Sequence, residues 1–263
     1  LASKISRNDF LRDGNTKFDK KTIRAALDSN LQRLQTDHID IYQLHWPERQ
    51  TNFFGQRGYT ESMAQQDTKE LTPFLETIEA LNDEITKGRI RAYGLSNDTP
   101  WGVMRYLAEA DKHGLARPIT IQNPYSLLNR LYEVGLAEIS HREQIGLLAY
   151  SPLAFGVLSG KYLGGNKPAN SRLSLYSHFT RYLNEQAQQA TQAYAEVAKK
   201  HNLDMAQMAL AFVNSRSFVT ANIIGATTIE QLASNIASVD LVLSQAVLAD
   251  IDAVQTLHPN PAP

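Results

Sequence analysis

The sequence predicts an α/β protein built from parallel β-α units. Short apolar runs alternate along the chain with longer segments of helical periodicity, and this order is typical of parallel sheets flanked by helices. The runs do not alternate between polar and apolar residues, as expected of strands buried on both faces. The segments 47–70 and 151–184 are too long for ordinary connections, and each follows the carboxyl end of a predicted strand. In barrel enzymes that end of the sheet carries the chemistry.

Six strands are expected, each bounded by polar residues or turn formers. They cover residues 1–6, 39–45, 90–95, 119–123, 145–150 and 221–226. The chain has no linker rich in Gly, Ser or Pro and no internal repeat. We therefore expect a single domain over residues 1–263.

Eight helices are expected between and after the strands. Asp19 can cap the first of them, and Thr99 followed by Pro100 is a typical helix start that Gly114 would end. The expected ranges are 20–35, 72–87, 100–113, 131–143, 185–201, 204–214, 228–238 and 244–256. The C-terminal "HPNPAP" is expected to be mobile.

Composition excludes several classes of function. The 263 residues carry 26 Lys and Arg against 27 Asp and Glu, a net charge of -1, so we expect neither a nucleic-acid partner nor binding to an anionic membrane surface. No uninterrupted apolar stretch reaches transmembrane length. The absence of cysteine excludes disulfides and thiolate chemistry and fits a cytoplasmic protein.

Polar and aromatic side chains end all six predicted strands. Taken singly, each has an ordinary structural explanation: a lysine is usually surface charge, a histidine at a strand end is usually hydrogen-bonded, and Ser-Asn before a helix is usually a cap. Their coincidence at one end of one sheet instead indicates a functional site. They are Lys4, His45 with Trp46, Ser96 with Asn97, Gln122 with Asn123, Tyr150 with Ser151, and Gly225 with Thr227.

The stretch "GATTIEQLASN" adds a second signal. Thr227 and Glu230 have the spacing of a capping box. Gly225 would allow the backbone to approach a ligand, and the free amides at a helix start attract a phosphate. An ordinary capped helix would give the same pattern.

Five motifs in order resemble the aldo-keto reductase family. They are "IYQLHWP", "GRIRAYGLSN", "IQNPYS", "LAYSPLAFGVLSGKY" and "IIGATTIEQLASNI". The resemblance covers the whole chain and is nearest to the bacterial Tas-like branch, close to the β subunits of voltage-gated potassium channels. It implies a (β/α)8 TIM barrel that binds NADP(H) in an extended pose without the GxGxxG fingerprint, which this sequence lacks.

The resemblance also assigns cofactor-binding residues by position. Ser96, Asn97 and Gln122 would hold the nicotinamide carboxamide, and Tyr150 would stack on the nicotinamide ring. Ser151, Leu153, Gly156 and Leu158 would line the pyrophosphate, while Lys161 and Arg172 would close over the cofactor's phosphates. Gly225, Thr227, Gln231 and Asn235 would hold the adenosine end with its 2'-phosphate.

The family's catalytic residues are matched only in part. Lys4 matches the lysine that lowers the pKa of a catalytic tyrosine, and His45 matches the histidine that orients the carbonyl of an aldehyde or ketone substrate. The family's tyrosine and aspartate lie on strands before the lysine strand, which is "LASKIS" here. Tyr42, Tyr93 and Tyr125 do not occupy the tyrosine position. We therefore expect a truncated chain that begins at the third barrel strand and lacks the first two β-α units.

Two questions of function stay open at this point. The first is whether the parent protein is a reductase or a non-catalytic, NADP(H)-binding regulatory subunit like those of the channels. A metal-dependent barrel hydrolase is disfavoured, because the seven histidines are scattered without a His-x-His at a strand end. The second concerns Trp46, Phe53 and Phe54, which are predicted to wall the substrate pocket. Phe53, Phe54 and Tyr59 could equally pack loop 47–70 onto the barrel.

Overall fold

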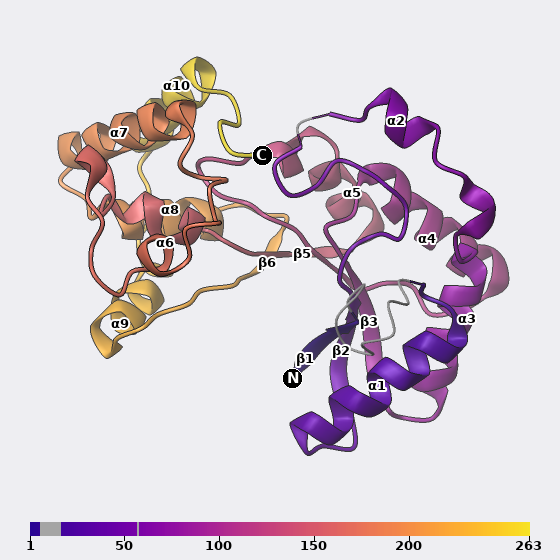
Figure 1. The fold of residues 1–263 in the computed structure, drawn as a ribbon. Coiled ribbons are helices and arrows are strands. Elements are labelled where there is room, and N and C mark those ends of the chain that lie inside the picture. The colour runs from indigo at the N-terminus through magenta and orange to yellow at the C-terminus, as the bar shows by residue number, and fades with distance from the viewer. Residues whose placement is uncertain (6–16, 57) are drawn as a thin grey trace. The chain divides into compact units, whose positions relative to one another are not determined.

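The computed structural model describes residues 1–5, 17–56 and 58–263 as two compact units. The first unit comprises residues 1–122 and 139–146, and the second comprises residues 123–138 and 147–263. The described strands number six and run parallel in chain order, which is the α/β arrangement predicted above and is consistent with a (β/α)8 barrel (Figure 1). Whether the two units form one domain stays a prediction.

The first unit is a parallel sheet with helices packed along one face (Figure 1). Its strands β1 (Ala2–Ile5), β2 (Ile39–Leu44), β3 (Ile90–Ser96) and β4 (Thr120–Gln122) pair in this order. The covering helices are α1 (Lys20–Leu34), α3 (Phe74–Thr86) and α4 (Pro100–His113); the long segment after β2 holds only the short α2 (Glu61–Ala64) and the 3-10 turn η1 (Thr68–Glu70).

The predicted helix ends in this unit are confirmed. The Asp19 side chain accepts a hydrogen bond from the backbone of Thr22, and Thr99 caps α4 in the same manner. Gly114 ends α4 in the left-handed conformation at φ 63°, which glycine adopts without steric cost.

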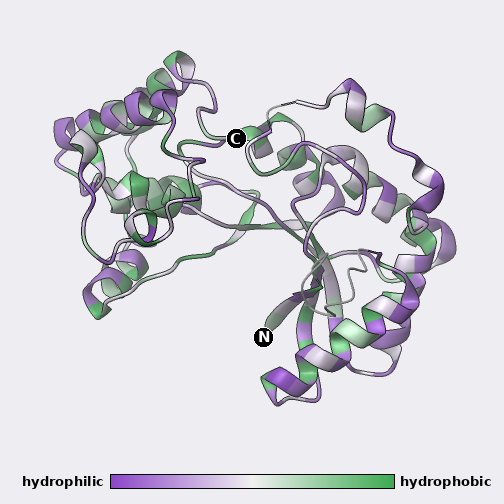
Figure 2. Ribbon diagram, viewed as in Figure 1, coloured by the Kyte–Doolittle hydropathy of each residue, from purple (hydrophilic) through white to green (hydrophobic). Residues whose placement is uncertain are grey.

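The second unit is mainly helical. It contains β5 (Gly146–Ala149, whose first residue belongs to the first unit) paired with β6 (Val219–Asn222), the 3-10 segments η2 (Leu131–Val134), η3 (Ala154–Ser159) and η4 (Leu163–Gly165), and helices α6 (Arg172–Leu175), α7 (Glu185–Lys200), α8 (Met205–Asn214), α9 (Ile229–Ala237) and α10 (Gln245–Leu257). The helix α5 (Leu136–Glu143) begins in this unit and ends in the first. Helix α8 is hydrophobic over most of its surface and buried (Figure 2).

Two expected elements in this unit were wrong. The helix predicted over 131–143 is divided at Gly135, whose extended backbone separates η2 from α5. The strand predicted over 221–226 lies at Val219–Asn222, because β5 ends at Ala149 and the last bond of the ladder runs from Ile223 N to Ala149 O. The apolar run that suggested the later position is partly exposed at Ile223, 39%.

The C-terminal tail is fixed, contrary to expectation. Ala262 is buried and its backbone N–H donates to the carbonyl of Leu128 at 3.1 Å. The Asn184 amide donates to the Pro261 carbonyl at 3.0 Å. Satisfied backbone groups and burial outweigh the proline content from which mobility was expected.

Candidate functional site

The candidate catalytic residues lie on the face of the first unit's sheet that points away from its helices. The other face is identified by two tyrosines. The Tyr42 hydroxyl lies 3.5 Å from the Asn30 amide nitrogen of α1, and the Tyr93 hydroxyl donates to the carbonyl of Ala116 at 3.0 Å. Because successive side chains in a strand alternate between faces, the residues that follow these tyrosines point to the opposite side.

A lower row of residues crosses this opposite face. The strand register pairs Lys4 with Gln43, Gln43 with Gly94, and Gly94 with Thr120. Residues paired in this way point to the same side of a parallel sheet. The row was not visible in the sequence beyond Lys4, because each of its members stands on a different strand.

An upper row lies two residues nearer the carboxyl ends of the strands. The pairing of Leu44 with Leu95 places His45 beside Ser96, and Ser96 pairs with Gln122. The backbone N–H of His45 donates to the carbonyl of Ile5 at 3.0 Å, which extends the ladder by one bond beyond β2. The structure therefore brings together Lys4, His45, Ser96 and Gln122, as the sequence predicted, on one face and in two adjacent rows.

The turn after β3 ties the upper row together. The Ser96 hydroxyl and the Asn97 backbone N–H both donate to the carbonyl of Gln122, at 2.7 and 3.1 Å. The Asn97 side chain donates to the carbonyl of His45 at 2.8 Å. Asn97 has a positive φ of 54°, which asparagine tolerates better than most residues. Asn97 thus holds the end of β2 against the end of β3.

The electrostatics of this face favour a neutral imidazole. Burial, with a smaller contribution from the Lys4 ammonium, lowers the pKa of His45 to about 4. Burial also lowers the pKa of Lys4. Among the described residues no carboxylate lies within ion-pair distance of Lys4. At neutral pH His45 therefore has one ring N–H to donate and one ring nitrogen to accept.

An aromatic cluster continues from His45 into the segment after β2. The rings of His45 and Trp46 are 4.2 Å apart, Trp46 stands edge-on to Phe54 at 5.8 Å, and Phe54 stands edge-on to Phe53 at 4.9 Å. Phe54 is 49% exposed, so one side of it is available to a ligand while the other packs on Trp46. The prediction that Trp46, Phe53 and Phe54 line a substrate pocket stays open.

A buried ion pair anchors the same segment to the start of α4. The Arg49 guanidinium donates to the Asp98 carboxylate at 2.5 Å and to the Thr99 hydroxyl at 3.0 Å, and it lies 5.0 Å from the Trp101 ring centroid. A side chain at Gly102 would begin 2.2 Å from both ion-pair partners. Sequence reasoning missed this pair, because 49 residues separate its members.

In the second unit, the candidate cofactor residues lie on the segment after β5. Tyr150 exchanges backbone hydrogen bonds with its neighbours: its N–H donates to Asn123 and its carbonyl accepts from Tyr125. Burial raises the pKa of Tyr150 to about 12, so its ring is neutral at physiological pH. Ser151 has a positive φ of 55°. The segment then enters η3, which contains Gly156 and the buried Leu158 and is preceded by the half-buried Leu153.

Two cations converge on η3. The Lys161 side chain lies across Gly156, where a side-chain carbon would begin 2.9 Å from its ammonium nitrogen. Gly156 also has φ +90°, a conformation that suits only glycine. The Arg172 guanidinium lies 4.1 Å from the Phe155 ring centroid. In the described part of the chain neither cation is paired with a carboxylate, so both can meet an anionic ligand.

The predicted adenosine-side residues gather at the start of α9, with one correction. The cap of α9 is Thr228, whose hydroxyl accepts from the backbone of Gln231. Thr227 is therefore not the capping residue that the spacing to Glu230 predicted. Instead its N–H and hydroxyl both donate to the Gln231 side chain at 3.1 Å. The Asn235 amide donates to the carbonyl of Gly225 at 3.3 Å, which closes this turn onto the helix.

Comparison with known proteins accounts for these motifs. The family model described as "Aldo/keto reductase family" matches residues 1–256. The chain belongs to the aldo/keto reductase family. The resemblance predicted from five motifs is thereby confirmed.

Relatives of the chain come from both bacteria and eukaryotes. Protein tas of Escherichia coli is 52% identical over all of this chain and 76% of its own length. An aldo-keto reductase of Babesia bovis is 36% identical over 90% of this chain and 86% of its own. A probable voltage-gated potassium channel subunit beta of Oryza sativa is 28% identical over 92% of this chain and 70% of its own. The family and these relatives support an oxidoreductase.

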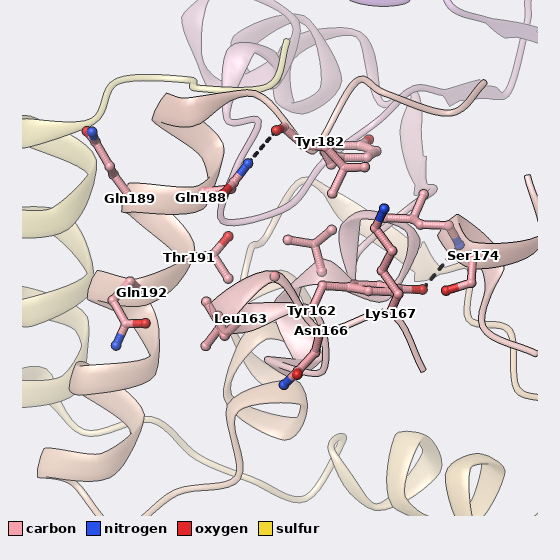
Figure 3. A pocket seen from close by; sticks show the side chains of 15 residues that line it. Tyr162, Leu163, Asn166, Lys167, Ser174, Tyr182, Gln188, Gln189, Thr191 and Gln192 are labelled. Carbon is pink, nitrogen blue, oxygen red and sulfur yellow. Dashed lines mark hydrogen bonds between the residues drawn. The ribbon is translucent and has the colours of Figure 1, made fainter. Parts of the chain in front are cut away.

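The second unit also contains a cavity of about 430 Å³ between segment 157–174 and α7 (Figure 3). Its lining includes Leu163, Leu173 and Leu183, together with Gln188, Gln189 and Gln192 of α7. As far as the described residues line it, the cavity includes none of the predicted cofactor residues. Among all the described residues, none of the helices meets the length and hydropathy expected of a membrane span.

Proposed function

We propose that this aldo/keto reductase reduces aldehydes or ketones to alcohols with NADP(H). The observation that carries the proposal is the two-row arrangement of Lys4, His45, Ser96 and Gln122 on one open face of the sheet. The partner is a small carbonyl compound, and the nearly balanced charge of -1 offers no field for nucleic acid or a membrane surface. The same composition, without cysteine, supports a cytoplasmic location.

His45 and Lys4 have distinct roles in this proposal. The bound nicotinamide supplies a hydride to the carbonyl carbon. As negative charge grows on the carbonyl oxygen, a fixed donor must meet it. A neutral His45 carries one ring N–H for that purpose and positions the oxygen. Lys4 is an ammonium whose charge would stabilise the anionic form of a neighbouring phenol, the proton donor that this family uses.

The residues of the second unit suit a cofactor with phosphate groups. Lys161 and Arg172 supply two cations, each held against an aromatic ring or a glycine. Charge-assisted contacts of this kind suit the phosphates over which these two side chains would close. Ser151, Leu153 and Leu158 would line the pyrophosphate, and the turn of Gly225 and Thr227 with Gln231 and Asn235 would hold the adenosine end. Tyr150 offers a neutral ring to stack on the nicotinamide.

The proton donor of the proposal is not one of the two tyrosines on strands β2 and β3. Tyr42 and Tyr93 both point to the helix side of the sheet, away from Lys4. We therefore propose that the tyrosine comes from outside the 263 residues. A chimera tests this: the part of the Escherichia coli relative that this chain does not cover would be joined to it.

The assay follows the loss of NADPH absorbance with 4-nitrobenzaldehyde. The chimera is expected to consume NADPH, and His45→Ala is expected to lower its kcat by about 100-fold or more. His38→Ala is the matched control, since His38 pairs with the exposed Asp37 at the surface. Turnover by the 263-residue chain alone would show that the donor lies within it. Equal rates for His45→Ala and the parent would overturn the role of His45.

One observation favours a second candidate function. Relatives from Oryza sativa and Arabidopsis thaliana are named as probable potassium channel β subunits, at 28% and 29% identity. A non-catalytic, NADP(H)-binding regulatory subunit would keep the cofactor residues without the chemistry. Tight NADPH binding by the chimera, with no consumption by any of a panel of aldehydes and ketones, would favour this alternative over the reductase.

A further inference from the structure

Gln43 is a buried side chain whose amide has no partner. Its exposure is 0%, and neither its amide nitrogen nor its amide oxygen forms a hydrogen bond within the described structure. The same is true of the hydroxyl of Thr120, which is 6% exposed. Buried polar groups are nearly always hydrogen-bonded, because a buried polar group without a hydrogen-bond partner destabilises the fold. Two such groups in one place indicate a ligand rather than chance.

The two groups are close together and face the same side. Both belong to the lower row, separated in register only by Gly94. A side chain at Gly94 would begin 2.3 Å from the Thr120 hydroxyl and 3.5 Å from the Gln43 side chain. The Thr120 hydroxyl and the Gln43 side chain therefore both lie over Gly94, in the region that a side chain there would need. Lys4 flanks Gln43 on the other side, one strand spacing of about 4.8 Å away.

We propose that Gln43 and Thr120 hold an ordered water molecule beside Lys4. A buried water needs two to four polar partners, and this row offers an amide donor, an amide acceptor, a hydroxyl and an ammonium. The lower row lies two residues farther from the carboxyl ends of the strands than His45, Ser96 and Gln122. A water there would accept from the Lys4 ammonium and keep it charged where burial otherwise favours the neutral amine.

A double-mutant cycle on thermal unfolding tests the site without any assay of activity. With a shared water, Gln43→Leu and Thr120→Val each leave the other group and the water short of partners, so each lowers Tm by several degrees. The double variant removes all the polar groups and recovers part of that loss. If the site is dry, each single change removes an unpaired polar group, so each raises Tm and the two effects add. That result would overturn the proposal.

Thr77→Val is the matched control. Thr77 is equally buried in the first unit, and its hydroxyl donates to the carbonyl of Phe18 at 3.0 Å. Its effect should add to that of Gln43→Leu, because the two share no partner. A crystal structure should show one water within about 3 Å of both Gln43 and Thr120, and density without it would contradict the inference.

The link to Lys4 rests on the proposed reductase function and has its own readout. Without the water, the Lys4 ammonium loses an acceptor, and the alkaline limb of the chimera's rate profile should move to lower pH in Gln43→Leu and Thr120→Val. Thr77→Val should leave it in place. If the alkaline limb of the rate profile does not move while the effects on Tm are non-additive, the water site stands and its connection to Lys4 is overturned. Absence of turnover in the parent chimera would count only against the reductase.

Discussion

The two units build their candidate sites in different ways. In the first unit, the catalytic candidates stand on strands, and ladder pairing fixes which residues share a face and a row. In the second unit, the cofactor candidates stand on turns, where Ser151, Phe155 and Gly156 have positive φ and two cations rest on the segment. Strand register sets positions within a fraction of a residue spacing, whereas turns depend on local contacts. Substitutions outside the two rows should therefore change the geometry of the first site little. The second site should be sensitive to substitutions within the turns that form it.

The largest expected effect is on the strand-built site. Lys4→Met keeps the length of the side chain but removes the charge, and it should lower the kcat of the chimera by about 100-fold or more. NADPH affinity should change little, because Lys4 is not among the predicted cofactor residues. Lys20→Met is the control, since Lys20 pairs with Asp83 at the surface. A large loss of NADPH affinity in Lys4→Met would contradict the division of roles between the units.

A smaller effect is expected on the turn-built site. Arg172→Ala removes one of the two cations at η3 and should weaken the binding of NADPH and of NADH by about 10-fold or more, because both cofactors carry the pyrophosphate. The loss should shrink as salt is added, because screening already weakens the contact in the parent. Fluorescence titration of the 263-residue chain measures both constants. Unchanged affinity for both cofactors would mean that Arg172 does not meet the cofactor's phosphates.

Gly102→Ala tests the Arg49–Asp98 ion pair, which anchors the segment after β2 to the start of α4. The new carbon would begin 2.2 Å from the Arg49 and Asp98 side chains, so the ion pair must shift. We expect a loss of about 1–3 kcal/mol in the free energy of unfolding, despite the better helix propensity of alanine. Gly58→Ala, with no atom near its new carbon, should be nearly neutral. Urea unfolding of both variants distinguishes strain from a general glycine effect.

The last expected effect is a pH dependence, which is absent at neutral pH and appears only on acidification. Burial lowers the pKa of His45 to about 4, below its ordinary value of about 6.5. As the pH falls below about 6.5, the unfolded chain takes up a proton before the folded chain does, so folding is weakened between about pH 6.5 and 4. His45→Gln should reduce the pH dependence of the unfolding midpoint in that window. Above pH 7 the midpoint should not depend on pH through this residue in either protein. An identical slope in both proteins would mean that His45 is not desolvated.

The sequence alone determined much of the fold, because local chemistry suffices for it. Strand and helix identities followed from apolar runs, and the caps at Asp19 and Thr99 followed from side chains that bond to their own helix starts. Expectations went wrong where a distant partner decides: the end of β6 depends on β5, and the tail of the chain is held by Leu128 and Asn184.

The candidate residues were also readable from the sequence, but their arrangement was not. Lys4, His45, Ser96 and Gln122 could be named from strand ends and family motifs, since chemistry at strand ends leaves a local signature. Gln43 and Thr120 left none, because a polar residue within an apolar strand is noticed only when its surroundings are known. The Arg49–Asp98 pair likewise exists only through the packing of two segments. Register across strands and burial are properties of the folded chain, and only the tertiary structure decided them.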